Sequence, residues 1–378
     1  MAKSATEMGT SSAPPDGRVD GLAGAGSDAL PRRFGRYVLF DRIGSGGMAD
    51  IYLARAQTEL GVARRVVIKD ILPELSGDAH FADMLIAEAK LVAGLRHANI
   101  AQVTDLGREA GRLFIAMEYV EGLDLNVLLR TLSKRKIPLP PELAFFIVRE
   151  VLVALDFAHR AKGADGAPLG IVHRDVSPSN VLISFEGEVK LCDFGIAKAT
   201  SAQAGRASRP SGPDESGERS RIAGKAAYMS PEHARGEAID ARADVFAAGI
   251  VLWELCAGRR LYRGSEDEML AQARAGKVPP LPDRGLPKQA DLQAILDLAL
   301  APDPNERWPA AAVFARELDA YAVANKLFAS QLRFGAFLSE HFELDVIAER
   351  RERERAAEAL ERAPAVVLEP ITEVRSTP

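Results

Sequence analysis

The sequence has few cysteines, no long apolar run and no surplus of positive charge. Its only two cysteines, Cys192 and Cys256, lie in apolar stretches, which excludes a disulfide framework and favours a reducing compartment. The chain has neither an apolar run of about 18 residues nor a charged-then-apolar start, so we expect no spanning helix and no secretory signal. With 48 Lys and Arg against 53 Asp and Glu, nucleic acid is not an expected partner. We expect a cytoplasmic protein.

What remains is the composition of an ordinary soluble protein, with 47% hydrophobic and 27% charged residues over 378 positions. Both ends lack a periodic apolar pattern, and a segment without one does not offset its ordering entropy. The sequence therefore predicts four parts: a disordered leader over 1–34, a folded domain over 35–322, a helical extension over 323–362 and a disordered tail over 363–378.

The most informative stretch is IVHRDVSPSNVLISFEGEVKLCDFG, over residues 171–195. Two short strand-like runs turn at Glu186-Gly187 inside it. An acid at Asp175, an amide at Asn180 and a second acid at Asp193 supply what phosphoryl transfer needs. Asp175 can orient an attacking hydroxyl and accept its proton, while Asn180 and Asp193 offer oxygen ligands to Mg²⁺.

These pieces resemble the catalytic loop H-R-D-x-x-x-x-N and the D-F-G turn of protein kinases. The resemblance extends over about residues 37–321 and is to the eukaryotic-like Ser/Thr protein kinases of bacteria. It implies an α+β, bilobed protein-kinase fold. The small N-terminal lobe (35–120) would hold an antiparallel sheet and one key helix, and the larger lobe (121–322) would be mostly helical. It also implies ATP and Mg²⁺ as cofactors.

A glycine cluster follows the first predicted strand, at Tyr37–Phe40. Taken alone, such a cluster is more often only a tight turn. Here it resembles the kinase Gly-rich loop, in which glycines let the backbone approach a polyphosphate, with Ala49 in place of the third glycine. No Gly-Lys-Ser/Thr follows, so it is not a Walker A loop. The resemblance assigns these residues to the nucleotide site: Ile43, Gly44, Ser45, Gly46, Gly47 and Ile51.

The strand ending at Lys69 resembles V-A-I-K, which makes Lys69 the partner of the α- and β-phosphates. The next predicted helix, over 79–95, carries two acids, Asp83 and Glu88. By periodicity alone, both acids could lie on a solvated face of the helix. The kinase resemblance selects Glu88 as the partner of Lys69.

An apolar strand from Leu113 that breaks at Gly122 resembles the hinge between the kinase lobes. By sequence alone Met117 is core filler. By resemblance it is the gatekeeper, with the backbone of Glu118 and Val120 facing the adenine. Leu182, just after Asn180, is assigned to the same nucleotide site.

The segment over 199–223 is rich in Ser, Arg, Gly and Pro, which predicts a flexible loop. By resemblance it is an activation segment that autophosphorylates between Thr200 and Ser220, and Arg174 would dock the phosphate. The same resemblance pairs Glu232 with Arg307 as a buried ion pair and makes Asp244 the acid that braces the catalytic loop.

Two positions depart from the Ser/Thr kinase pattern: Ser177 stands where lysine is usual, and Lys225 where threonine is usual. Our hypothesis is that Lys225 supplies, as a catalytic residue, the charge missing at 177, with Ser177 as its hydrogen-bond partner. The alternative is that Lys225 is an exposed loop residue.

Beyond the folded domain, a helical stripe of apolar residues predicts packing on the lobe or on a partner. The stripe consists of Phe334, Phe337, Leu338, Phe342 and Val346. From Glu349 to Arg362 the pattern becomes Glu, Arg and Ala, which predicts a solvated helix.

The sequence thus predicts an ATP- and Mg²⁺-dependent kinase that phosphorylates Ser or Thr of proteins and itself. The resemblance also allows a homodimer for autophosphorylation in trans. Two rivals remain: a pseudokinase scaffold that binds ATP, and a small-molecule phosphotransferase. The intact Lys69, Asp175, Asn180 and Asp193 argue against the first. The Ser230-Pro231-Glu232 segment and the long loop before it argue against the second. Tyrosine specificity is disfavoured more weakly.

Overall fold

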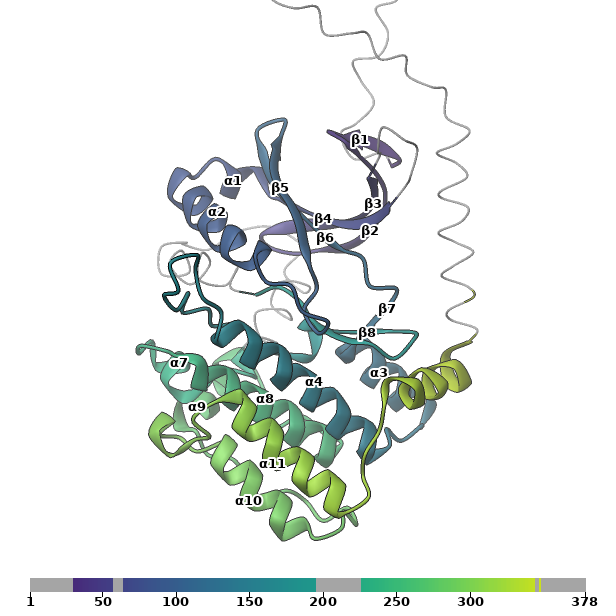
Figure 1. Cartoon of the computed structure of the whole chain (residues 1–378), viewed down its shortest axis with the longest axis vertical. Coiled ribbons are helices and arrows are strands. Elements are labelled where there is room, and N and C mark those ends of the chain that lie inside the picture. Colours follow the sequence, from purple (N-terminus) through teal and green to yellow (C-terminus); the bar gives the residue numbers. More distant parts are fainter. Residues whose placement is uncertain (1–29, 57–63, 195–225, 344–346, 348–378) are drawn as a thin grey trace, which may run out of the picture.

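The computed structural model describes residues 30–56, 64–194, 226–343 and 347, and they form two lobes. The upper lobe in Figure 1 is a curled sheet with two helices on one side, and the lower lobe is mostly helical. The predicted bilobed α+β fold is confirmed.

The small lobe is built on one antiparallel sheet in the order β1-β2-β3-β4-β6-β5. The sheet begins earlier than the predicted domain start at residue 35, because Arg32 pairs with Leu39 and Phe34 with Tyr37. Its strands are β1 (Arg32–Phe34), β2 (Tyr37–Ser45), β3 (Ala49–Ala56), β4 (Arg64–Ile71), β5 (Val103–Glu109) and β6 (Arg112–Glu118).

Alternation along the strands gives each face of this sheet its own core. On one face Val66 and Ile68 of β4 pack with Tyr37, Leu39 and Phe114. The other face is covered by α1 (Pro73–Ser76) and α2 (Ala79–Ala93), as Figure 1 shows. There Ile71 packs with Phe81 and Leu85 of α2. The Asp78 side chain accepts from the backbone N–H of Phe81 at 3.1 Å and so starts α2.

The large lobe is organised around α8, which is buried on almost every side, as an all-round apolar helix must be. The helices are α3 (Leu125–Arg135), α4 (Pro141–His159), α7 (Pro231–Arg235), α8 (Ala241–Ala257), α9 (Glu266–Ala275), α10 (Gln289–Ala299) and α11 (Ala311–Ala324), with 3₁₀ turns η1 (Pro178–Asn180) and η2 (Pro304–Glu306). The prediction of a mostly helical larger lobe is confirmed.

A second small sheet lies between the helices and the hinge. It consists of β7 (Gly122–Asp124), β8 (Val181–Ser184) and β9 (Val189–Leu191), all antiparallel. The predicted hairpin at Glu186-Gly187 is therefore confirmed. The hairpin has Asn180 directly before its first strand and Asp193 shortly after its second, so it sets the spacing of these two side chains.

The extension packs on the large lobe. The sequence suggested one helical extension from residue 323. In the structure α11 ends at Ala324, and a separate helix runs over 331–343 (yellow in Figure 1). Phe334, Leu338 and Phe342 are at most 1% exposed and join the main core. Phe334 meets Phe146 of α4 edge-on at 6.2 Å between ring centroids. Val346 and the charged stretch after residue 348 lie outside the described residues.

No helix among the described residues is long and apolar enough to cross a membrane.

Candidate active site

The catalytic-loop backbone is held by one buried carboxylate. Asp244, at the start of α8, accepts from the backbone N–H of His173 and of Arg174, each at 2.8 Å. The ring Nε2 of His159 lies 2.8 Å from the same carboxylate. Burial alone would raise the pKa of Asp244, but the His159 hydrogen bond and the backbone donor lower it below its ordinary value. Asp244 therefore braces the loop as an anion, as predicted.

His173 ties this loop to the turn that carries Asp193. The backbone N–H of Asp175 donates to His173 Nδ1 at 3.2 Å, so Nε2 carries the ring proton and donates to the carbonyl of Cys192 at 2.9 Å. The ring also lies 4.5 Å from that of Phe194, between centroids. His173 is completely buried. A fixed tautomer thus links Asp175 to the residues around Asp193.

Asn180 is oriented toward the loop by its own side chain. Its amide Nδ2 donates to the carbonyl of Asp175 at 2.6 Å, which leaves the amide oxygen available as an acceptor. Carboxylate and amide oxygens are the ligands that Mg²⁺ prefers, and it usually takes only one or two protein ligands beside phosphate oxygens. Asn180 and Asp193 fit that donor set. Among the described residues no cluster of three or more His, Cys, Asp or Glu forms a separate metal site.

Lys69 and Asp193 are joined directly across the two lobes. The Lys69 ammonium lies 3.0 Å from Asp193 Oδ2, and the two side chains are 12% and 26% exposed. The backbone of Asp193 has φ +61°, and that of Arg174 has φ +67°. A non-glycine residue in this region costs about 1–3 kcal/mol and persists only where its surroundings impose it. Both strained residues therefore lie in the candidate site.

The structure does not pair Lys69 with Glu88, as the sequence suggested. Glu88 instead lies 3.9 Å from Arg174 Nη1. Lys69 is neutralised by Asp193. Through Glu88, α2 is thus ion-paired with the catalytic loop rather than with Lys69 of β4. The physical reason is that each carboxylate already has a cation beside it, Arg174 for Glu88 and Lys69 for Asp193.

Strand register brings the predicted nucleotide residues onto one face of the sheet. Ile51 pairs with Lys69 across β3 and β4, and Val67 pairs with Met117 across β4 and β6. Directly opposite residues share a face, and so do residues two apart in one strand. A small cavity of about 10 Å³ is lined by Met117, by Ala89 and Val92 of α2 and by Phe194. Met117 therefore lies on the same face of the sheet as Lys69, beside this cavity, and its role as gatekeeper stays a prediction.

The predicted Gly-rich loop is the tight connection between β2 and β3. The backbone N–H of Gly46 donates to the carbonyl of Ala49 at 3.0 Å and closes the turn. Gly44 and Ser45 are still in β2, paired with Ile51 and Asp50. Ile43 remains 46% exposed, which suits a side chain that covers a ligand.

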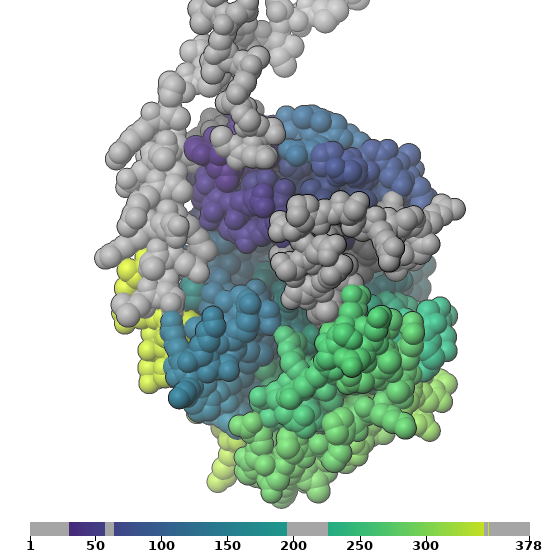
Figure 2. Space-filling model, turned by 180° about the vertical axis from the view of Figure 1, so that it is seen from behind, coloured from purple at the N-terminus to yellow at the C-terminus, as the bar shows by residue number. Residues whose placement is uncertain are grey.

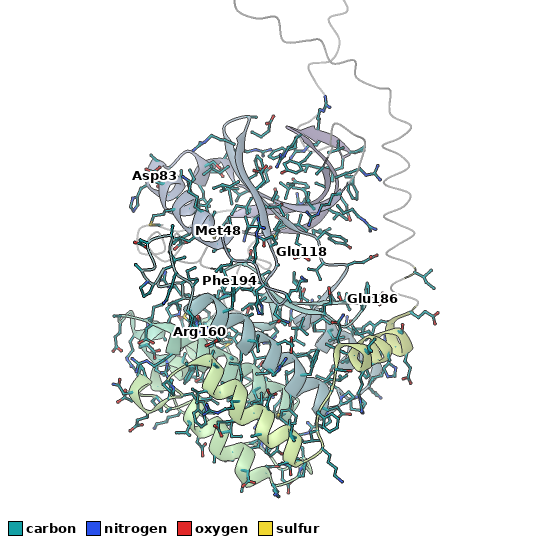
Figure 3. All side chains as sticks on the ribbon, in the orientation of Figure 1. Met48, Asp83, Glu118, Arg160, Glu186 and Phe194 are labelled. Atoms are coloured by element: carbon teal, nitrogen blue, oxygen red, sulfur yellow. The ribbon has the colours of Figure 1, made fainter. Side chains whose placement is uncertain are left out.

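The hinge is fixed by Gln102 and Lys190, to which the sequence motifs gave no role. The backbone N–H of Glu118 donates to the carbonyl of Gln102 at 2.8 Å. The Glu118 carboxylate lies 3.1 Å from the ammonium of Lys190, on β9. Figure 3 shows Glu118 and Phe194 at the level where the lobes meet. Lys190 sits two residues before Cys192 in a short apolar run, and that break in the run was the available signal. Leu182 of β8 pairs with Lys190 and with Asp124 of β7, directly below the hinge.

The end of the activation segment is anchored by the predicted ion pair. Arg307 donates to both oxygens of Glu232 at 2.7 Å, and its side chain is completely buried. Burial opposes ionisation of Glu232, yet the Arg307 hydrogen bonds lower the pKa of this carboxyl below its ordinary value. The predicted pair is confirmed. Lys225 and the acceptor residues between Thr200 and Ser220 lie outside the described residues.

Comparison with known proteins agrees with the resemblance of the sequence to protein kinases. The protein kinase domain family matches residues 37–318. Tyrosine-protein kinase MasK of Myxococcus xanthus is 36% identical over 86% of this chain and 49% of its own length. Serine/threonine-protein kinase PknB of Mycobacterium leprae is 35% identical over 76% of this chain and 43% of its own. The chain thus spans less than half the length of either relative.

Solved structures agree with the fold. The crystal structure of the Mycobacterium tuberculosis PknI kinase domain is 28% identical, has a TM-score of 0.56 and covers 78% of this chain and 99% of its own. The braced loop, the strained Asp193 and the Glu232–Arg307 pair all fall inside the matched region. The chain belongs to the protein kinase family.

Proposed function

We propose that the protein is an ATP- and Mg²⁺-dependent kinase that transfers the γ-phosphate of ATP to Ser or Thr hydroxyls of proteins. The observation that carries this is the convergence of Lys69, Asp175, Asn180 and Asp193 where the two lobes meet. The 3.0 Å contact of Lys69 with Asp193 and the 2.6 Å bond from Asn180 to the Asp175 carbonyl support it.

Each side chain then has a role that its chemistry permits. Asp175 orients the acceptor hydroxyl and accepts its proton. Lys69 binds the α- and β-phosphates, and Glu88 is its partner in the active arrangement. Asn180 and Asp193 would hold Mg²⁺, which neutralises the charge of the phosphates when it is bound. The backbone of Glu118 and Val120 would bind the adenine; the Glu118 N–H is already bonded to Gln102, so its carbonyl is the group left for this.

The remaining parts of the proposal concern regulation and location. Autophosphorylation between Thr200 and Ser220, Lys225 as a catalytic residue, a homodimer that acts in trans and a cytoplasmic location are proposed on the sequence alone. The pseudokinase alternative gains no support from the comparisons. A second acceptor, tyrosine, is favoured by one observation, the name of the MasK relative, whereas the PknB relatives are named as serine/threonine kinases.

The test is incubation of the purified chain with labelled ATP and Mg²⁺, beside Asp175→Asn and Asp193→Asn, followed by identification of the labelled amino acid. Label on Ser or Thr in the wild type alone supports the proposal, and its mapping between Thr200 and Ser220 supports the regulatory part. Label on Tyr alone would show that the acceptor is tyrosine rather than Ser or Thr. Nucleotide binding without label would favour the pseudokinase scaffold.

A further inference from the structure

Four exposed arginines lie close together on the large lobe. Arg130 is on α3, and Arg259, Arg260 and Arg263 are in the connection between α8 and α9. The two segments are in contact, because Arg260 Nη2 donates to Asn126 Oδ1, on α3, at 2.9 Å. We call these four residues the arginine surface. In Figure 2 the blue of this part of α3 borders the green region that follows residue 226.

The arginine surface reaches the end of the activation segment. The Arg260 guanidinium lies 5.5 Å from the ring centroid of Tyr228, two residues before Ser230. Tyr228 lies in the chain between the proposed activation segment and the Glu232–Arg307 pair. Burial and then the nearby charge of Arg130 lower the pKa of Arg260. The arginines therefore influence one another, and α3, which carries Arg130, contacts η1, which ends at Asn180 of the candidate site.

Within the described part of the chain, the arginine surface forms one ion pair with an acid. Among the described residues, the acid paired with this cluster is Glu254, which lies 3.3 Å from Arg260 and is 6% exposed. Burial raises the pKa of Glu254 to about 8, so much of it is protonated at neutral pH. Two of the other nearby acids are committed to helix starts, since Asp124 accepts from the Val127 N–H at 2.8 Å and Glu268 closes a capping box with Ser265. Glu266 and Asp267, in the first turn of α9, also follow Arg263 but form no ion pair with it in the described part of the chain.

We propose that the arginine surface binds acidic residues that flank the acceptor Ser or Thr, so that the kinase selects acidic segments of its protein substrates. The inference rests on the proposed kinase function and specifies its substrate class. Guanidinium groups bind carboxylates through paired hydrogen bonds, and a surface of one charge speeds the approach of the opposite charge. The occupant is thus an acidic peptide segment.

The test uses three peptides that differ only at the positions around one acceptor, which carry Glu, Ala or Lys. For the full chain, kcat/KM should be highest for the Glu peptide, mainly through KM, and the advantage should shrink with added salt. Arg130→Glu with Arg263→Glu should reverse the preference. Replacing either arginine by Ala should lower it about two- to fivefold, the scale of an exposed ion pair. Arg316→Ala, exposed on α11, is the matched control and should change nothing.

Binding separates this inference from the kinase activity. Versions of the peptides with Ala at the acceptor position, followed by fluorescence anisotropy, should bind in the same order as they are turned over. Equal binding of the Glu and Ala peptides, or an unchanged order of affinities in the double variant, would overturn the proposed role of the arginine surface. Turnover of the peptides in the same experiment would still support the kinase function. Preferential binding of the acidic peptide without phosphate transfer to any acceptor would keep the surface and overturn the proposed function. Arg260 is left unchanged because it packs on Tyr228 and Glu254.

Discussion

Lys69 of the small lobe and Asp193 of the large lobe lie 3.0 Å apart, and Glu88 faces Arg174 at 3.9 Å. Both of these pairs differ from the pairing needed for phosphate binding, in which Lys69 and Glu88 act together and Asp193 holds metal. The described arrangement therefore holds these charged groups in the site, but Lys69 and Glu88 each have another partner. Under the proposed function, turnover requires that Lys69 leave Asp193 and pair with Glu88.

Glu88→Gln should lower kcat by about tenfold or more, because an active-state interaction lost from the transition state is worth at least that. The reason is that the neutral amide pairs weakly with Lys69 once Asp193 is taken up by metal. Steady-state kinetics against ATP measures this. Asp83→Asn is the control, since Asp83 is exposed on the same helix. Equal effects of the two changes would show that Glu88 never pairs with Lys69.

Arg307→Ala should destabilise the protein by about 3–5 kcal/mol, because it leaves the buried Glu232 carboxylate without its partner. Both side chains are at most 5% exposed and share two hydrogen bonds. Urea denaturation followed by circular dichroism gives the free energy of unfolding. Arg316→Ala, which removes an exposed arginine paired with Glu317, should cost less than about 1 kcal/mol. Similar losses in both variants would contradict a structural role for the buried pair.

Gly187→Ala should cost at least about 1 kcal/mol more than Gly166→Ala, the usual scale of overpacking. Both glycines have φ near +80°, so the backbone strain is matched. At Gly166 a Cβ would meet nothing within 4 Å, whereas at Gly187 it would overlap the Gln331 carbonyl and lie 2.6 Å from the Gly335 nitrogen. Figure 3 shows the neighbouring Glu186 beside the helix over 331–343.

Hydrogen exchange locates that effect. The backbone amides of residues 334–343 should exchange faster in the Gly187→Ala protein than in the Gly166→Ala protein, because the added methyl group pushes the extension helix from the hairpin. If both variants exchange alike there, the extension does not depend on this contact.

Glu254 should make stability depend on pH. Its pKa is about 8 in the folded protein and near the ordinary value of 4.5 when unfolded, so the folded state holds its proton more tightly. The contribution is fully present below about pH 4.5 and is lost as the pH rises toward about 8. Thermal melts between pH 5 and about 8 should fall more steeply for the wild type than for Glu254→Gln, whose amide does not titrate. Parallel slopes would show that Glu254 does not titrate in this range.

Lys225→Ala should lower turnover by about 10²-fold if Lys225 supplies the charge that Ser177 lacks. The exchange Ser177→Lys with Lys225→Thr should restore most of it, because it returns the ammonium and the hydroxyl to their usual places. Single-turnover kinetics of autophosphorylation measures both. Lys277→Ala, an exposed lysine after α9, is the control. Unchanged turnover in Lys225→Ala would show that Lys225 is only a loop residue.

The sequence by itself determined the family, the catalytic loop, the Asp244 brace and the pair of Glu232 with Arg307. These follow from the resemblance of short motifs in the chain to those of protein kinases, which implies a role for each residue. The helices and the β8–β9 hairpin followed as well, because their apolar periods are local properties of the chain.

Only the tertiary structure decided the partners of Lys69 and Glu88. These partners depend on where α2 stands against the large lobe, which no spacing in the sequence records. The same holds for Lys190 with Glu118, for the arginine surface and for the extension helix on Gly187. Each joins segments far apart in the chain, and their contact is set by the packing of whole elements rather than by the residues next to them.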